Sequence, residues 1–505
     1  MSRQGRAPAT TPIAGTQTVG VTKSNSSAAK TDAPPSLPWA EAQSFWSTRL
    51  LPFCMAKLLG IWQSLRSSLW FVPNALVVFA VALAIALIEA DTWFDEGVLN
   101  RWPRFFGAGA SGARGMLSAV ASSMITVAGV VFSITLVALS LASSQYTSRV
   151  LRNFMNDRTN QTVLGVFVGI FAYCLVVLRT IRDGPDFVFV PSLAVLGGVV
   201  LAFVGIGFFI HFIHHIATTI QASHILARIA AETVERIDHL FPQGVGDEDE
   251  DRSDQDPTSA DPRRHWHLAL SLRTGYIQRV EGEPLLAIAQ DQKTVIRMER
   301  RIGDFVVEGM PLASILTADE SALPSQEVFN RLSAAYTIDT QRTTDQDAAY
   351  GIRQIVDVAL KALSPGINDT TTAVMCLDYL TAILLRLCAR SIESPCRFDE
   401  GHLRVITRGA TFAGLVELAF DQVRQNAGGN VAVLSRLAEA LHTLEGKTQR
   451  PNRRRILLHQ THALDEVIRR TIAAALDREP LQSRAMRLFE LLKTTNAETK
   501  TTPAA

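Results

Sequence analysis

The sequence predicts a mainly α-helical membrane protein. A four-helix transmembrane domain is followed by a cytosolic α+β domain, built from a small β-barrel-like module and a helical bundle. Three observations lead to this fold class. Apolar residues make up 47% of the 505 residues and charged residues only 19%. Four long uncharged runs follow one another in the first half of the chain. The second half returns to the mixed patterning of a water-soluble protein.

The four uncharged runs each approach or exceed the roughly 20 apolar residues that a helix needs to cross a bilayer. We expect them within a transmembrane domain of residues 45–240, at about 67–90, 115–144, 162–180 and 189–217. Four spans place both termini on the same side of the membrane. Arginine and lysine are more frequent beside that side than in the opposite loops, which favours cytoplasmic termini.

The other segments are recognised by composition and patterning. They are a disordered N-terminal segment (1–44), an acidic linker (241–263), a small β-rich module (264–320), a helical cytosolic domain (321–493) and a disordered tail (494–505). The β-rich module rests on "RIGDFVVEGMPLASIL", which is typical of strand, turn and strand around Gly303 and Gly309. The helical domain contains one strand-like run, "HLRVIT".

Several functional classes are disfavoured by what the sequence lacks. The net charge of +1 gives no general attraction to nucleic acid, which we do not expect as a partner. The five cysteines form no C-x-x-C pair, so a structural zinc site is not expected. No P-loop, dinucleotide fingerprint, nucleophile elbow or H-E-x-x-H motif occurs, and we therefore expect neither an enzyme nor a cofactor.

A stripe of hydroxyl side chains runs along the second predicted span. Its members recur every four or seven residues, which places them on one helical face: Ser118, Ser122, Thr126, Ser133, Ser140 and Ser144. Two interpretations remain open. The stripe packs against another helix, or it faces a pore in an oligomer, where hydroxyls replace part of the hydration shell of an ion. The span carries no charged residue, which disfavours an ion-coupled transporter.

The fourth predicted span ends in "HFIHHIATTIQASH". His211 and His215 are four residues apart, a spacing that suits a metal ion or a pH response, but the spacing alone is a weak signal and we favour packing of these histidines at headgroup depth. Further along, "KTQRPNRRRILLHQ" includes Arg453 and Arg454 and is typical of an exposed basic loop, which could contact anionic lipid.

The polar stretch "LSPGIND" separates two helical patterns. Pro365 ends the first helix, Gly366 allows the chain to reverse, and Asp369 supplies a cap to a helix that begins near Thr370. An alternative is a polar pocket at this turn that binds an ion or small ligand. Its residues would come from one helix face and from the turn: Tyr350, Arg353, Gln354, Asp357, Asn368 and Asp369.

Five motifs together resemble a known family. They are "SSQYTSRVLRNFMNDRTNQTVLGVFVGIFAYCLVVLRTIR", "FFIHFIHHIA", "GYIQ", "GDFVVEGMPL" and "ALSPGINDTTTA". Over roughly residues 45–490 the chain is similar to bacterial predicted membrane proteins grouped as domain of unknown function 2254. The resemblance implies a multi-pass inner-membrane protein with a large cytosolic domain, and it implies no particular activity.

The expected function therefore rests on the residues. We favour an oligomeric channel or gated conduit for ions or small solutes with a cytosolic regulatory domain, in contact with the bilayer and with further copies of itself. A membrane-anchored sensor or scaffold without conduction is the main alternative. An enzyme acting through a pocket around Asp369 is the least supported.

Overall fold

The structure is a computed structural model of the chain. It describes residues 70–93, 109–145, 157–183, 188–219, 221–241, 265–317, 323–392 and 395–498. The predicted disordered N-terminal segment (1–44) and nearly all of the acidic linker (241–263) lie outside these ranges. The last helix continues to Glu498, so residues 494–498 are helical and not part of a disordered tail.

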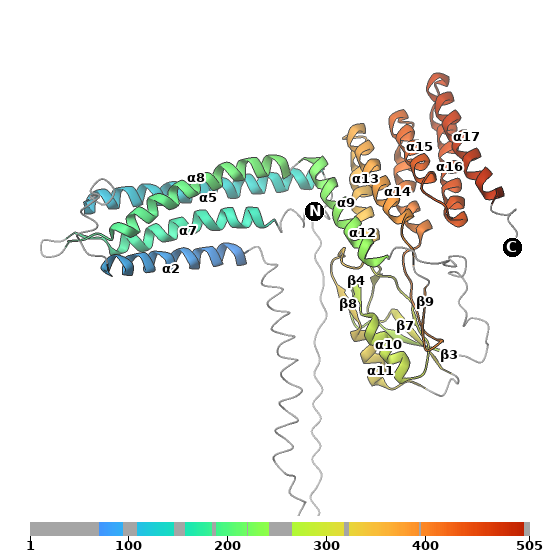
Figure 1. Cartoon of the computed structure of the whole chain (residues 1–505), viewed down its shortest axis with the longest axis horizontal. Helices are drawn as coiled ribbons and strands as arrows, with labels where there is room; N and C mark the ends of the chain where they lie inside the picture. The colour runs from blue at the N-terminus through green and yellow to red at the C-terminus, as the bar shows by residue number, and fades with distance from the viewer. Residues whose placement is uncertain are drawn as a thin grey trace, which may run out of the picture. The chain divides into compact units, whose positions relative to one another are not determined.

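Each of the four apolar runs lies in one long helix. These helices are α2 (Phe71–Trp93), α5 (Ala110–Gln145), α7 (Arg158–Thr180) and α8 (Ser192–Thr219). They lie side by side (Figure 1) and enclose a core of small, aliphatic and aromatic residues. A two-stranded hairpin, β1 (Arg182–Asp183) and β2 (Val188–Phe189), joins α7 to α8. The carboxylate of Asp91, near the end of α2, accepts bonds of 3.1 Å from the backbone N–H groups of Ser192 and Leu193 at the start of α8.

Close contacts at glycines define the directions of these helices. A Cβ added at Gly165 of α7 would meet Pro73 and Leu76 of α2, and one added at Gly169 would meet Leu76 and Ala80. The contacted residues have higher numbers in α2 as the numbers rise in α7, so α2 and α7 run parallel. Gly198 and Gly205 of α8 meet Leu117 and Met124 of α5 in the same way. The four helices therefore alternate in direction along the chain.

The β-rich part contains two sheets and two helices. One sheet has the order β3-β7-β5-β10-β9 and the other β6-β4-β8. The elements are β3 (His265–Leu270), β4 (Gly275–Val280), α10 (Gly282–Asp291), β5 (Ile296–Met298), β6 (Phe305–Val306), β7 (Pro311–Thr317), α11 (Gln326–Ala334), β8 (Tyr336–Asp339), β9 (Cys396–Asp399) and β10 (His402–Ile406). Three strands come from beyond residue 320, so the module is larger than predicted. Its described strands form two sheets and not one closed barrel.

The helical domain consists of seven described helices around one core of leucine, isoleucine and valine side chains. They are α9 (Ala222–Leu240), α12 (Ala348–Ala362), α13 (Thr370–Cys388), α14 (Phe412–Asn426), α15 (Val431–Glu445), α16 (Pro451–Thr471) and α17 (Ala475–Glu498). α9 falls inside the predicted transmembrane domain, but Leu226, Ile229 and Ile237 are buried in this core. The prediction that the membrane domain extends to residue 240 is therefore wrong.

By length and composition, five of the described helices could cross a membrane: α2, α5, α7, α8 and α13. The fifth was not predicted as a span. It packs against α9, α12 and α15 within the helical core. Hydropathy alone does not distinguish a membrane span from the central helix of a large bundle, because both are surrounded by apolar atoms.

Candidate functional site

The hydroxyl stripe of α5 faces away from the other membrane helices. Ser118, Ser122, Thr126, Ser133 and Ser140 are all exposed, and only the side chain of Ser144 lies outside what the structure describes. The opposite face of α5 carries the residues that pack into the bundle, Leu117, Ala121, Met124, Ala128 and Val131. Packing of the stripe within its own bundle is thus excluded for the five described members.

The same face of α5 also carries small residues without hydroxyls. Gly112, Gly115 and Gly129 are exposed, and an added Cβ at any of them would meet no atom within 4 Å. Gly112, Ala119, Thr126, Ser133 and Ser140 are spaced by seven residues. Seven-residue spacing is typical of helices that wind around one another with a left-handed twist. Sequence analysis recorded only the hydroxyls and missed these glycines.

The predicted polar pocket is not assembled. Tyr350 lies at the start of α12, where the guanidinium of Arg342 stacks on its ring. Arg353 forms an ion pair of 2.7 Å with Asp357 and donates a 2.8 Å bond to Gln422 of α14. The 12 residues from Tyr350 to Ala362 rise about 18 Å along the helix. Tyr350 therefore lies far from the turn, and the polar residues of α12 have structural partners.

The predicted cap at the turn between α12 and α13 is confirmed. Asp369 accepts a 3.0 Å bond from the backbone N–H of Thr372 and a 2.5 Å bond from its hydroxyl, at the start of α13. The hydrogen bond from the Thr372 side chain is the main reason that the pKa of Asp369 is lowered. Asn368 is exposed and has a positive φ of 49°, which asparagine tolerates. Neighbouring Thr370 accepts a bond from Asn430, the cap of α15.

The histidines of α8 have a partner that sequence analysis missed. His215 lies 2.5 Å from the carboxylate of Asp157, which caps the start of α7. The ring of His211 stacks on that of His215, with centroids 6.1 Å apart. Among the described residues, no group of three or more His, Cys, Asp or Glu is placed to hold a metal ion. The cap position of Asp157 is visible in "NDRTN", but its approach to His215 depends on how two helices pack.

The basic run before and within α16 is not an exposed loop. Arg453 is only 1% exposed and donates to the backbone oxygens of Leu387, Cys388 and Arg390, at the end of α13. Its guanidinium also stacks on Phe412. Arg454 is buried too and is paired with Glu445. Both arginines are structural. Arg453 satisfies carbonyls that the end of α13 leaves free, and Arg454 donates to the carbonyl oxygens of Thr448 and Leu491, so neither is available to lipid.

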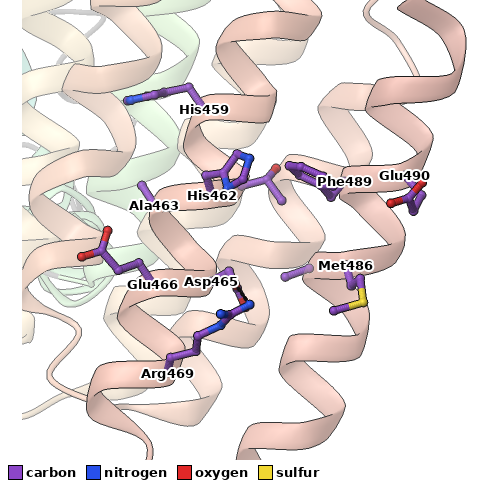
Figure 2. A pocket seen from close by; sticks show the side chains of 11 residues that line it. His459, His462, Ala463, Asp465, Glu466, Arg469, Met486, Phe489 and Glu490 are labelled. Atoms are coloured by element: carbon purple, nitrogen blue, oxygen red, sulfur yellow. Dashed lines mark ion pairs between the residues drawn. The ribbon is translucent and has the colours of Figure 1, made fainter. Parts of the chain in front are cut away.

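A groove of about 620 Å³ lies between α16 and α17. Figure 2 shows His462 and Phe489 facing each other across it, and their rings are in edge contact with centroids 4.4 Å apart. Asp465 is paired with Arg469 at 2.7 Å, while Met486 contributes an apolar surface. Sequence analysis missed this groove because its residues belong to two helices and face one another only after these pair.

Comparison with known proteins agrees with this architecture. The family described as predicted membrane protein (DUF2254) matches residues 66–443. Uncharacterized proteins of Mycobacterium tuberculosis (strain H37Rv) and Mycobacterium bovis (strain AF2122/97) are each 29% identical over 464 residues, covering 90% of this chain and 86% of theirs. No solved structure matches the chain. With its several long apolar helices, the chain is a multi-pass membrane protein, and it belongs to the DUF2254 family.

Proposed function

We propose that the protein forms an oligomeric conduit for ions or small solutes in the bacterial inner membrane, with α5 of each copy lining the central axis. The observation that carries this proposal is the outward position of the hydroxyl stripe. From Ser118 to Ser140 the stripe covers 22 residues, about 33 Å of helix, which matches a hydrocarbon core of about 30 Å. Neighbouring copies would give these hydroxyls a polar environment that lipid does not offer.

The proposed topology has four spans, with both termini and the soluble domain in the cytoplasm. The fifth apolar helix, α13, stays in the soluble domain. Its Asp378 is paired with Arg436 of α15, and its Arg386 with Asp238 of α9. Charged residues at membrane depth are costly, whereas in a cytosolic bundle such pairs lie near the surface. Reporter fusions at Asp95 and Gly184 should indicate the periplasm, and a fusion after Asp247 the cytoplasm. The opposite pattern would refute this topology.

A membrane-anchored scaffold without conduction is the second candidate. It is favoured by the glycines of the α5 face, because small residues let two helices approach until their backbones touch and leave no space for a solute. In this case α5 helices pair tightly in the oligomer. In the conduit they surround an open axis. Both candidates require further copies of the chain, and they differ in whether anything passes.

Ion flux into liposomes that contain the purified full-length protein tests the conduit. Leucine at both Ser133 and Ser140 should abolish flux and leave the oligomer intact, because the change narrows the path and removes its hydroxyls. Leucine at Ser123, which is exposed but lies off the stripe, is the matched control and should leave flux unchanged. If the double substitution dissociates the oligomer, the scaffold is favoured. If the unmodified protein shows no flux, the conduit is wrong.

A further inference from the structure

One contact between an imidazole and a carboxylate joins two membrane helices near the end of the bundle. His215, in the last turns of α8, lies 2.5 Å from a carboxylate oxygen of Asp157, and the two side chains are 24% and 11% exposed. The other carboxylate oxygen accepts the backbone N–H of Thr159 at 2.9 Å, which fixes Asp157 in place. The imidazole is therefore held by a positioned carboxylate, at a point where α8 is about to end.

Among the described residues, few other ionizable groups lie near this pair. On α8 itself, His211 stacks on His215, and His214 is exposed on another face. On α7, Arg158 is exposed. The described ends of α2 and α5 that lie at this level, residues 70–76 and 138–145, carry no charged or titratable side chain. On α9 the nearest are His224 and an exposed pair, Arg228 with Glu232. Asp157 is thus the acidic partner of His215 among the described residues here.

The helix beyond this pair is attached to the soluble domain. α8 ends at Thr219 and α9 begins at Ala222. Asp238 of α9 accepts two bonds of 2.6 Å from Arg386 and one of 2.6 Å from Arg390. Thr233 of α9 presses against Gly351 of α12, where a Cβ would collide with its side chain. The joint between α8 and α9 therefore lies between two attachment points: the ion pair on its membrane side and the helical core on the other.

We propose that the Asp157–His215 pair is a proton-controlled latch, which holds the end of α8 against α7 and so governs how freely the α8–α9 joint moves. Imidazole side chains change charge between about pH 5 and 8. A protonated ring forms an ion pair with the carboxylate, whereas a neutral ring only donates a hydrogen bond to it, without the attraction between opposite charges. The latch is closed when His215 is protonated, and it loosens as the pH rises.

The latch gives the proposed cytosolic regulator a physical route to the membrane helices, but it does not depend on conduction. The segment from α8 to α9 is attached at two points, by the contact of His215 with Asp157 and by the bonds of Asp238 with Arg386 and Arg390. It transmits force between the two domains only while both sets of contacts are formed. A loosened pair lets the soluble domain move without displacing α8, and a closed pair couples the two. Proton concentration on the side of Asp157 then sets the degree of coupling.

Backbone hydrogen exchange of residues 212–224 tests the latch in the full-length protein in lipid nanodiscs. Protection, corrected for the intrinsic pH dependence of exchange, should fall about fivefold to tenfold between pH 5.5 and 8.5, as the ion pair is replaced by a hydrogen bond from a neutral ring. Asp157→Asn keeps the helix cap and His215→Gln keeps a hydrogen-bonding side chain, and either should remove the pH dependence.

A further histidine variant serves as a control. His214→Gln should behave as the unmodified protein, because His214 does not contact Asp157. Protection that does not change with pH in the unmodified protein, or a pH dependence that survives His215→Gln, would overturn the proposal.

Discussion

The membrane bundle and the helical domain are both built from long apolar helices, yet they pack in different ways. In the bundle several helix contacts are close because one partner is a glycine, as at Gly165 against α2 and Gly198 against α5; in the helical domain the comparable contact between described helices is Gly351 of α12 against Thr233 of α9. In the helical domain, leucine, isoleucine and valine side chains fill the core. Lipid tails are as apolar as leucine, so burial of leucine drives no association in a bilayer, and close backbone contact must provide it. In water, the burial of the same side chains is the main driving force.

This difference helps to place α13, which is apolar enough for a membrane but packs like a helix of a soluble core. Its buried residues are Leu377, Leu380, Leu384 and similar large side chains, and its end is capped by the buried Arg453. The membrane helices are linked at their ends by a few polar groups, such as Asp91 and Asp157. The mode of packing thus distinguishes the two kinds of helix where composition does not.

The largest expected effect is the loss of Arg453. Arg453→Met should lower the free energy of unfolding by about 3 kcal/mol or more, because two buried carbonyls and one partly buried carbonyl lose their donor and each unsatisfied group costs about 1–3 kcal/mol. Denaturant unfolding of the full-length protein in detergent, followed through the helical domain, measures this. Arg455→Met is the matched control, since Arg455 is exposed, and should change stability by less than about 0.5 kcal/mol. Equal effects in both variants would refute the structural role of Arg453.

The next effect tests the glycine packing of the bundle. Gly165→Leu places a side chain where a Cβ alone would lie 2.7 Å from Leu76 and 2.8 Å from the Cα of Pro73. We expect a loss of about 1–3 kcal/mol from overpacking, seen as a lower melting temperature of the bundle. Gly207→Leu is the control, because no atom lies within 4 Å of a Cβ added there. A bundle that tolerates leucine at both positions would show that close approach is not required.

A smaller effect is expected at the cap of α13. Asp369→Ala should cost about 0.5–2 kcal/mol, and Asp369→Asn should recover most of it, because the amide oxygen accepts the same backbone bond. Equilibrium unfolding of the full-length protein measures both variants. Full stability in Asp369→Ala would show that the bonds to Thr372 contribute nothing.

The smallest expected effect is on the stability of the fold at low pH. The hydrogen bonds from Thr372 lower the pKa of Asp369 in the folded chain, so the unfolded chain binds a proton first as the pH falls. The stabilisation is complete above the unfolded value of about 3.9 and is lost as the pH falls through the lower folded value. Asp369→Asn should therefore flatten the acid side of the stability curve. Asp238, whose pKa is lowered by its bond from Arg386, should retain its share of the acid dependence in that variant.

The sequence predicts features that depend on neighbours in the chain. The apolar runs, the cap at Asp369 and the hydroxyl stripe each need only local spacing and residue type, and the first two agree with the structure at the level of helices and caps. Gly165 and Gly169 form a G-x-x-x-G pattern that was also within reach, because small residues four apart favour helix association in membranes. That pattern was overlooked in favour of the hydroxyls.

The features that were missed depend on residues far apart in the chain. Arg453 belongs to a run that looks solvated, and only the end of α13, 63 residues earlier at Arg390, explains its burial. The partner of His215 is 58 residues away. The α12 residues of the predicted pocket share one helix face by spacing. Arg353, however, is bonded to Gln422 of α14, and Tyr350 is separated from the turn by most of the length of α12. Periodicity predicts which face of a helix is polar, but it does not predict which other elements pack against that face.

The pairing of β10 with β5 has a consequence for the order in which the protein is made. The two strands run parallel, with Val405 opposite Ile296, and α12 and α13 lie between them in the chain. β5 and β10 cannot pair until the ribosome has passed residue 406. By then all the proposed membrane helices and the first helices of the helical domain have been synthesised. Such distant pairing folds slowly. A chain truncated before β10 would lack the strand that joins β9 to β5 and would expose an unpaired strand edge, which invites aggregation.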